Sequence, residues 1–172
     1  PSFISGGKTF QDDLVIERGY VEGRFVEGER VKIFVKIVKT EKTRQPAIIV
    51  LNDFKVGEDD ELLVSLAKNG YCAVMVDIQG KIENSENFTI YPEKISYANL
   101  TTSTYGKREI EGDITKTCFY EWCGALKYVV AYLNSLKTIS KIGVLGINDG
   151  GLSVWHSLAN TSEISCAVLV NN

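Results

Sequence analysis

The sequence predicts an α/β fold: a mostly parallel sheet with an antiparallel hairpin on its N-terminal side and helices on both faces. Three observations support this prediction. Residues 15–39 alternate apolar and polar side chains, as half-buried strands do. Short unbroken apolar runs follow, which are typical of strands covered on both faces. Between these runs, apolar residues recur at three- and four-residue steps, the period of an amphipathic helix. Strands that alternate with helices favour a parallel sheet, because crossover connections are right-handed.

The N-terminal region divides into an arm and a hairpin. Residues 1–13 contain few apolar side chains and two adjacent glycines, so we expect a loosely held arm. Val15–Val26 and Glu29–Lys39 are separated only by Glu27 and Gly28, which predicts an antiparallel hairpin.

The remainder reads as strands and helices in turn. We expect buried strands at Ala47–Leu51, Cys72–Ile78, Ile142–Ile147 and Cys166–Val170. We expect helices from Asp59 or Asp60 to Gly70, from Phe119 to Leu136 with Thr117 as a cap, and from Leu152 to Leu158. Residues 79–117 form a long polar loop, a length that favours a functional or a disordered segment. All 172 residues are expected to form one domain.

The composition argues against a nucleic-acid-binding protein, a membrane-spanning protein and a cysteine metal site. The net charge of -3 argues against nucleic-acid binding, and no apolar run approaches the ~20 residues that span a bilayer. The four cysteines (Cys72, Cys118, Cys123 and Cys166) have no metal-ligand spacing, so we expect buried free thiols, no metal, no cofactor and a cytoplasmic location.

The stretch from Lys141 to Gly151 predicts a buried strand followed by a sharp turn into a helix, and the rest of the prediction is built around it. A short apolar run meets a Gly-x-x-x-Gly-Gly turn, and an amphipathic segment follows. Gly146 and Gly150 flank Asn148 at the spacing of a nucleophile elbow, in which a sharp strand-to-helix turn exposes its central residue. That central residue is an asparagine, and an amide is a poor nucleophile.

The chain resembles the first part of an α/β-hydrolase, in particular the acetyl xylan esterase, cephalosporin-C deacetylase and dipeptidyl-peptidase-like branch. The motifs that carry the resemblance are Pro46–Phe54, Val76–Gly80, the helix Thr117–Leu136 and Gly146–Gly151. The resemblance implies a truncated α/β-hydrolase fold of about six strands that lacks the later strands carrying the triad acid and histidine.

The resemblance also implies positions for a site. Asn148 occupies the serine position, and Asp149, Asp53 and Phe54 occupy oxyanion-hole positions. Asn52 and Asp53 follow a buried strand at its carboxyl end, where ligands bind in open α/β sheets. Together with Asn148 they are the candidate binding residues.

Simpler interpretations exist for each of these residues. Asn148 suits a backbone with positive φ, and Asp149 suits the first turn of a helix. His156, the single histidine, lies about two helical turns beyond Asn148, too far to act as its base. We expect Asp77 to hold the loop that follows it and the two tryptophans to pack in the core.

Three functions remain open. The first is a catalytically silent hydrolase homologue, a pseudoenzyme, that binds a small ester, sugar or peptide. The second is an ester or peptide hydrolase whose C-terminal part lies outside this sequence, with Asn148 natural or introduced. The third is an anion- or nucleotide-binding α/β module that uses the glycine turn. We also expect a dimer formed through an edge strand at Cys166–Val170, because unpaired apolar edges recruit partners.

Overall fold

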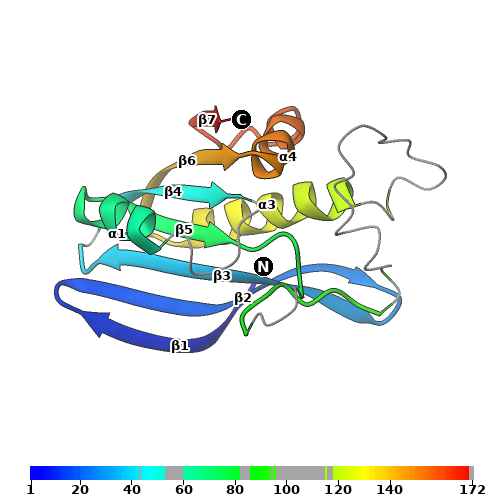
Figure 1. Ribbon diagram of the computed structural model, residues 1–172, viewed down its shortest axis with the longest axis horizontal. Coiled ribbons are helices and arrows are strands. Elements are labelled where there is room, and N and C mark those ends of the chain that lie inside the picture. Colours follow the sequence, from blue (N-terminus) through cyan, green and yellow to red (C-terminus); the bar gives the residue numbers. More distant parts are fainter. Residues whose placement is uncertain are drawn as a thin grey trace.

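Seven strands form one mixed sheet in the order β1-β2-β3-β5-β4-β6-β7 (Figure 1). The computed structural model describes residues 1–42, 44–52, 60–81, 86–93, 95, 115 and 118–170. The strands are β1 (Phe3–Gln11), β2 (Leu14–Val26), β3 (Glu29–Thr40), β4 (Gln45–Leu51), β5 (Cys72–Val76), β6 (Ile139–Ile147) and β7 (Cys166–Val170). The helices are α1 (Asp60–Lys68), α3 (Cys118–Ser135) and α4 (Asp149–Leu158).

The sheet is half antiparallel, which corrects the prediction of a mostly parallel sheet of about six strands. β1, β2, β3 and β5 pair antiparallel in succession. β5, β4, β6 and β7 pair parallel. The predicted hairpin is confirmed as β2 and β3, and a further strand extends it.

That further strand is the segment expected to be a loose arm. Residues 3–11 pair with β2 along their whole length, with a bulge between Ser5 and Gly7. Almost every side chain of β1 is exposed, so the strand shows no apolar alternation. The prediction was wrong because an exposed edge strand needs only backbone hydrogen bonds and leaves no buried pattern in its sequence.

Helices cover both faces, as expected. Side chains of the central strands alternate between two apolar clusters, as the pleat of a sheet requires. On one face Ile33, Ile49 and Val74 pack against α3 and Val154 of α4 (Figure 1). On the other face Phe34, Val50 and Met75 pack against Leu63 and Ala67 of α1. α1 and α3 therefore bury apolar side chains that their sequences predict to face the core, whereas α4 buries Val154 and leaves Trp155 and Leu158 exposed.

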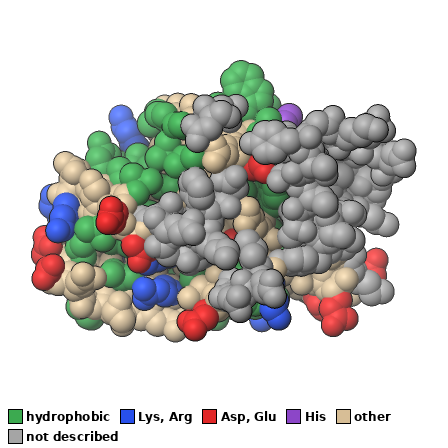
Figure 2. Space-filling model, viewed as in Figure 1, with side chains coloured by type: hydrophobic (Ala, Val, Ile, Leu, Met, Phe, Trp, Pro, Cys, Tyr) green, Lys and Arg blue, Asp and Glu red, His purple; other side chains and the backbone are tan. Residues whose placement is uncertain are grey.

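The β7 end of the sheet carries exposed apolar side chains. Val168 of β7 is 58% exposed and Trp155 of α4 is 64% exposed. Hydrophobic atoms gather over this end in the space-filling view, above the region where the ribbon shows β6, β7 and α4 (Figure 2). Cys166 is also exposed. The expectation that Trp155 and Cys166 are buried was therefore wrong, because Cys166 belongs to the last strand of the described sheet and Trp155 lies on α4, which packs next to it.

No helix in the described part of the chain is long and apolar enough to cross a bilayer. Most of the loop expected at residues 79–117 lies outside the described residues. Its described part includes Ile90, which forms a single antiparallel bridge with Lys32 of β3.

Candidate functional site

Asn148 stands at the apex of the turn between β6 and α4. Its backbone has φ 51° and ψ -122°, and its carbonyl accepts the first hydrogen bond of α4 from the N–H of Leu152 at 3.2 Å. The positive φ agrees with the prediction. The ψ value lies far from the left-handed helical region, the conformation in which asparagine is common. Tolerance of asparagine for positive φ therefore explains only part of this conformation.

The glycines of the turn allow backbones to touch. A Cβ at Gly146 would lie 2.6 Å from the Cα of Gly151. A Cβ at Gly150 would lie 2.2 Å from the carbonyl oxygen of Leu51 and 2.8 Å from the nitrogen of Asn52. No real Cβ fits at such distances, so the strand, the helix and the end of β4 meet here only because these residues lack side chains.

The structure brings the elbow together with the ends of two neighbouring strands. The N–H of Asn148 donates a hydrogen bond of 2.9 Å to the carbonyl of Val170 in β7. Asn52, at the end of β4, is 3% exposed, and Asp149 is 7% exposed. Asn52, Asn148 and Asp149 therefore lie at one edge of the sheet, whereas Asp53 and Phe54 lie outside the described residues.

His156 does not share this location. It is an exposed residue on α4 that lines a groove of about 750 Å³ between α3 and α4. Asn148 is not among the described residues that line this groove. The structure therefore gives no support for His156 as a base for residue 148.

The groove between α3 and α4 was not predicted from the sequence. Its described lining residues include three with basic side chains and none with a carboxylate side chain: Arg24, Lys127 and His156. Gly124 lies in the middle of α3, and a Cβ there would meet nothing within 4 Å. A glycine within a strong helical repeat costs about 0.5–1 kcal/mol relative to alanine, so it was the available signal for a hollow on this face of α3.

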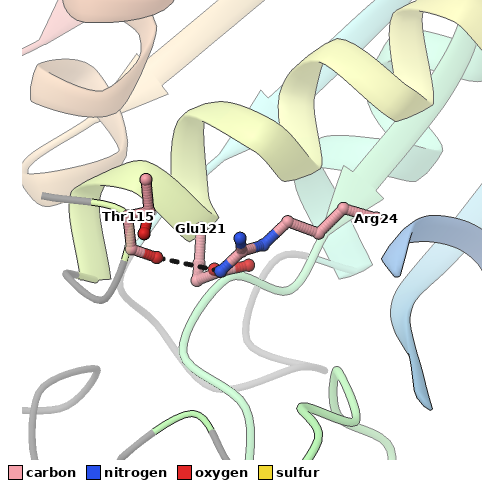
Figure 3. Close-up of polar contacts among 3 residues, drawn as sticks. All are labelled: Arg24, Thr115 and Glu121. Carbon is pink, nitrogen blue, oxygen red and sulfur yellow. Dashed lines mark hydrogen bonds and ion pairs between the residues drawn. The ribbon is translucent and has the colours of Figure 1, made fainter. Parts of the chain in front are cut away.

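A partly buried ion pair lies at one end of this groove. The guanidinium of Arg24, on β2, pairs with the carboxylate of Glu121 on α3. It also donates a hydrogen bond of 2.9 Å to the carbonyl of Thr115 (Figure 3). The guanidinium carbon lies 4.9 Å from the ring centre of Tyr120. Burial raises the pKa of Glu121, and the hydrogen bond and charge of Arg24 oppose that shift. The pair joins the first turns of α3 to the antiparallel half of the sheet.

A second polar centre lies after β5. Oδ2 of Asp77 accepts hydrogen bonds from the N–H of Thr89 at 2.6 Å and of Gly80 at 3.1 Å. The hydroxyl of Thr89 donates to the carbonyl of Asp77 and accepts from the N–H of Phe34. Burial raises the pKa of Asp77, and these backbone donors oppose the shift. Asp77 thus holds the following loop against β3, as the sequence suggested.

Two of the described thiols, those of Cys72 and Cys123, are poorly suited to act as nucleophiles. Cys72 is buried, and desolvation raises its pKa to about 11, which disfavours the thiolate. Cys123 is half-buried, and desolvation raises its pKa as well. Across the described ranges, no three His, Cys, Asp or Glu side chains gather in a way that could hold a metal ion.

Comparison with known proteins gives matches in structure only. No family model and no curated protein matches the sequence. An acetyl xylan esterase from Paenibacillus sp. R4 matches with a TM-score of 0.68 at 15% identity, over 96% of this chain and 51% of that one. Acetyl xylan esterase 1 from Thermoanaerobacterium sp. JW/SL YS485 matches with a TM-score of 0.61 at 14% identity, over 97% and 51%.

A third structural match is an enzyme of a different class. A dienelactone hydrolase-like promiscuous phosphotriesterase from metagenomic libraries has a TM-score of 0.61 at 15% identity, over 91% of this chain and 59% of its own. The chain spans about half the length of the two acetyl xylan esterases. At identities of 14–15%, these matches show a shared fold. The sheet order, the elbow and these matches together show that the chain has the α/β-hydrolase fold.

Proposed function

We propose that this chain is a non-hydrolytic member of the α/β-hydrolase fold that binds a small ester-like ligand at its elbow. The observation that carries the proposal is Asn148, an amide on a backbone that retains the geometry of the turn, with φ 51° and ψ -122°. An amide donates and accepts hydrogen bonds, but it gives no alkoxide or thiolate for attack on an acyl carbon.

The surroundings of Asn148 support binding. Asn52 lies buried beside the elbow, and Asp149 begins α4, where backbone N–H groups of the first helical turn point out of the helix end. Such N–H groups attract a carbonyl oxygen. The chain's single histidine lines the separate α3–α4 groove.

The first test is an assay of short-chain acyl esters such as p-nitrophenyl acetate with the parent chain and with Asn148→Ser. We expect no turnover above the Asn148→Ala variant in either protein, because a serine without a base remains unactivated. Hydrolysis by the parent that disappears in Asn148→Ala would overturn the proposal. Thermal stabilisation by acetylated xylo-oligosaccharide, lost in Asn148→Ala, would support the binding role.

A second candidate is an ester hydrolase completed by residues outside this sequence. The retained contacts of Gly146 and Gly150 favour it, because they preserve a strained turn. This candidate predicts turnover by Asn148→Ser in any longer form of the protein. An anion-binding module instead predicts stabilisation by phosphate or nucleotide that esters do not give.

We further propose that β7 pairs with its own copy in a dimer. β7 is the last strand of the described sheet, its residues Cys166–Val170 carry no charge, and Val168, Leu169 and Val170 are exposed. An uncharged strand meets its copy without like-charge repulsion.

Sedimentation at several concentrations measures this association. We expect a dimer that Val168→Lys converts to a monomer. Phe10→Lys, on β1 at the opposite edge, is the matched control and should leave the dimer intact. A parent protein that stays monomeric at high concentration contradicts the pairing.

A further inference from the structure

The backbone conformation of Asn148 places its own side chain close to the backbone nitrogen of the next residue, Asp149. At ψ -122° the Cα–Cβ bond of an L-residue eclipses the bond from its carbonyl carbon to the next nitrogen. The side chain and the nitrogen of Asp149 therefore leave the peptide on the same side. In a helix or a strand, ψ turns that nitrogen away from Cβ.

This arrangement is the one that a five-membered imide requires. The ring contains the nitrogen of Asp149 and four carbons of Asn148: the carbonyl carbon, Cα, Cβ and Cγ. Closing it in an ordinary residue first demands a rotation into a sparsely populated backbone region, at a cost of about 1–3 kcal/mol. In the folded chain the glycine contacts and the hydrogen bond to Val170 already hold Asn148 in that region.

We propose that Asn148 is a site of self-catalysed deamidation, in which the fold positions the nitrogen of Asp149 to attack the side-chain amide. The attacking nitrogen loses its proton as the N–Cγ bond forms. The tetrahedral adduct expels Nδ2 as ammonia, which leaves a succinimide. Water then opens the imide at Cγ to give aspartate or at the backbone carbonyl to give isoaspartate. The sum is Asn plus water giving Asp plus ammonia, without an oxidant or a cofactor.

The product changes what the elbow can do. Aspartate at residue 148 places a carboxylate, a side chain that forms covalent intermediates in some hydrolases, where the amide stood. Its negative charge lies at the N-terminus of α4, where the helix dipole stabilises an anion. Isoaspartate lengthens the backbone by one atom and is expected to open the turn. The inference stands independently of whether the elbow binds an ester.

The chain provides its own reference site at Asn69. Asn69 precedes Gly70, the neighbour that hinders attack least because it has no side chain. In the folded protein, however, the N–H of Gly70 donates to the carbonyl of Ala67, and Nδ2 of Asn69 donates to the carbonyl of Ser65. Both reacting groups at this site are therefore held in other hydrogen bonds. We expect residue 69 to react faster in the unfolded chain and residue 148 to react faster in the folded chain.

The experiment follows both sites by peptide mapping and mass spectrometry during incubation at near-neutral pH, in buffer and in concentrated urea. We expect residue 148 to deamidate about tenfold faster in buffer than in urea, since the fold removes the conformational entropy of fixing one residue. We expect residue 69 to show the opposite order. Isoaspartate should be present among the products at 148.

Three results would overturn the proposal. One is a rate at 148 in buffer no greater than in urea. Another is a product that contains aspartate only, which indicates direct hydrolysis without an imide. The third is equal ammonia release by Asn148→Gln, whose longer side chain forms a less favourable ring and whose backbone can still occupy the turn. A circular dichroism spectrum of each variant confirms that it is folded when compared.

Discussion

The two corners that leave the sheet on either side of β4 are held by opposite means. The corner after β6 contains Gly146 and Gly150, and its close packing depends on the absence of side chains. The corner after β5 depends on a side chain, because the buried carboxylate of Asp77 accepts hydrogen bonds from backbone N–H groups that include those of Thr89 and Gly80. The first corner should therefore be damaged by added atoms, and the second by removed atoms or by a change of charge.

The largest effect is expected from Gly150→Ala. Its Cβ would lie 2.2 Å from the carbonyl oxygen of Leu51 and 2.4 Å from the carbonyl carbon. Both are backbone atoms, which cannot move without displacing the end of β4. We expect a loss of about 3 kcal/mol in the free energy of unfolding, measured by urea denaturation.

Gly124→Ala is the matched control for this change. A Cβ at Gly124 has open space around it, so alanine should stabilise α3 by about 0.5–1 kcal/mol. Equal effects of the two substitutions would show that the elbow is not closely packed.

Asp77→Ala should cost less than Gly150→Ala. It leaves the N–H groups of Thr89 and Gly80 without the acceptor shown here, in a buried place, at about 1–3 kcal/mol. Asp77→Asn keeps one acceptor oxygen and should lose less stability. If alanine and asparagine destabilise equally, the hydrogen bonds to Oδ2 do not hold this corner.

A smaller, pH-dependent difference should separate the parent from Asp77→Asn. Burial raises the folded-state pKa of Asp77 above its ordinary value of 3.8, so the folded state binds the proton more tightly than the unfolded state does. This contribution to stability is fully present below the ordinary value and is lost as the pH rises through the raised one.

Thermal unfolding across the acidic range measures that difference. The Tm of the parent should fall relative to that of Asp77→Asn as the pH rises from below 3.8, because only the parent has a carboxyl to ionise. A gap in Tm that is constant over this range would contradict the assignment.

The smallest effect is expected from Asn148→Gly. Glycine adopts φ 51° and ψ -122° without steric cost, but it loses more backbone entropy on folding. These terms oppose one another, so we expect a net change within about 1 kcal/mol, on the stabilising side. A loss of several kcal/mol would mean that the amide side chain holds the turn through its contacts.

The sequence predicts the buried elements well and the exposed ones poorly. β2, β3, α1 and α3 carry periodic apolar patterns, and β4, β5 and β6 carry apolar runs, because each packs against an apolar cluster. β1 carries none, since its side chains face solvent, and the sheet was therefore misjudged in strand number and direction. β7 has the apolar composition of an inner strand but lies at the edge, so its burial was misjudged.

The candidate site divides in the same way. The spacing of Gly146, Asn148 and Gly150 predicts the elbow and the positive φ, because short-range sterics determine both. The value of ψ and the bond from Asn148 to Val170 depend on the tertiary fold. The α3–α4 groove is lined by residues far apart in the sequence, such as Arg24 and His156, so local patterns do not predict it. Gly124, a single glycine within a helical repeat, was the one sequence signal for it.

The hydrogen bond between Asn148 and Val170 has a consequence for the order of assembly during synthesis. The N–H of Asn148 donates to the carbonyl of Val170, which lies 22 residues later in the chain, in the last strand of the described sheet. β4 and β6 are synthesised earlier and can pair before β7 emerges. While β7 is still inside the ribosome tunnel, the turn lacks its hydrogen bond to Val170. The apex of the turn therefore reaches its final shape only after β7 has left the tunnel.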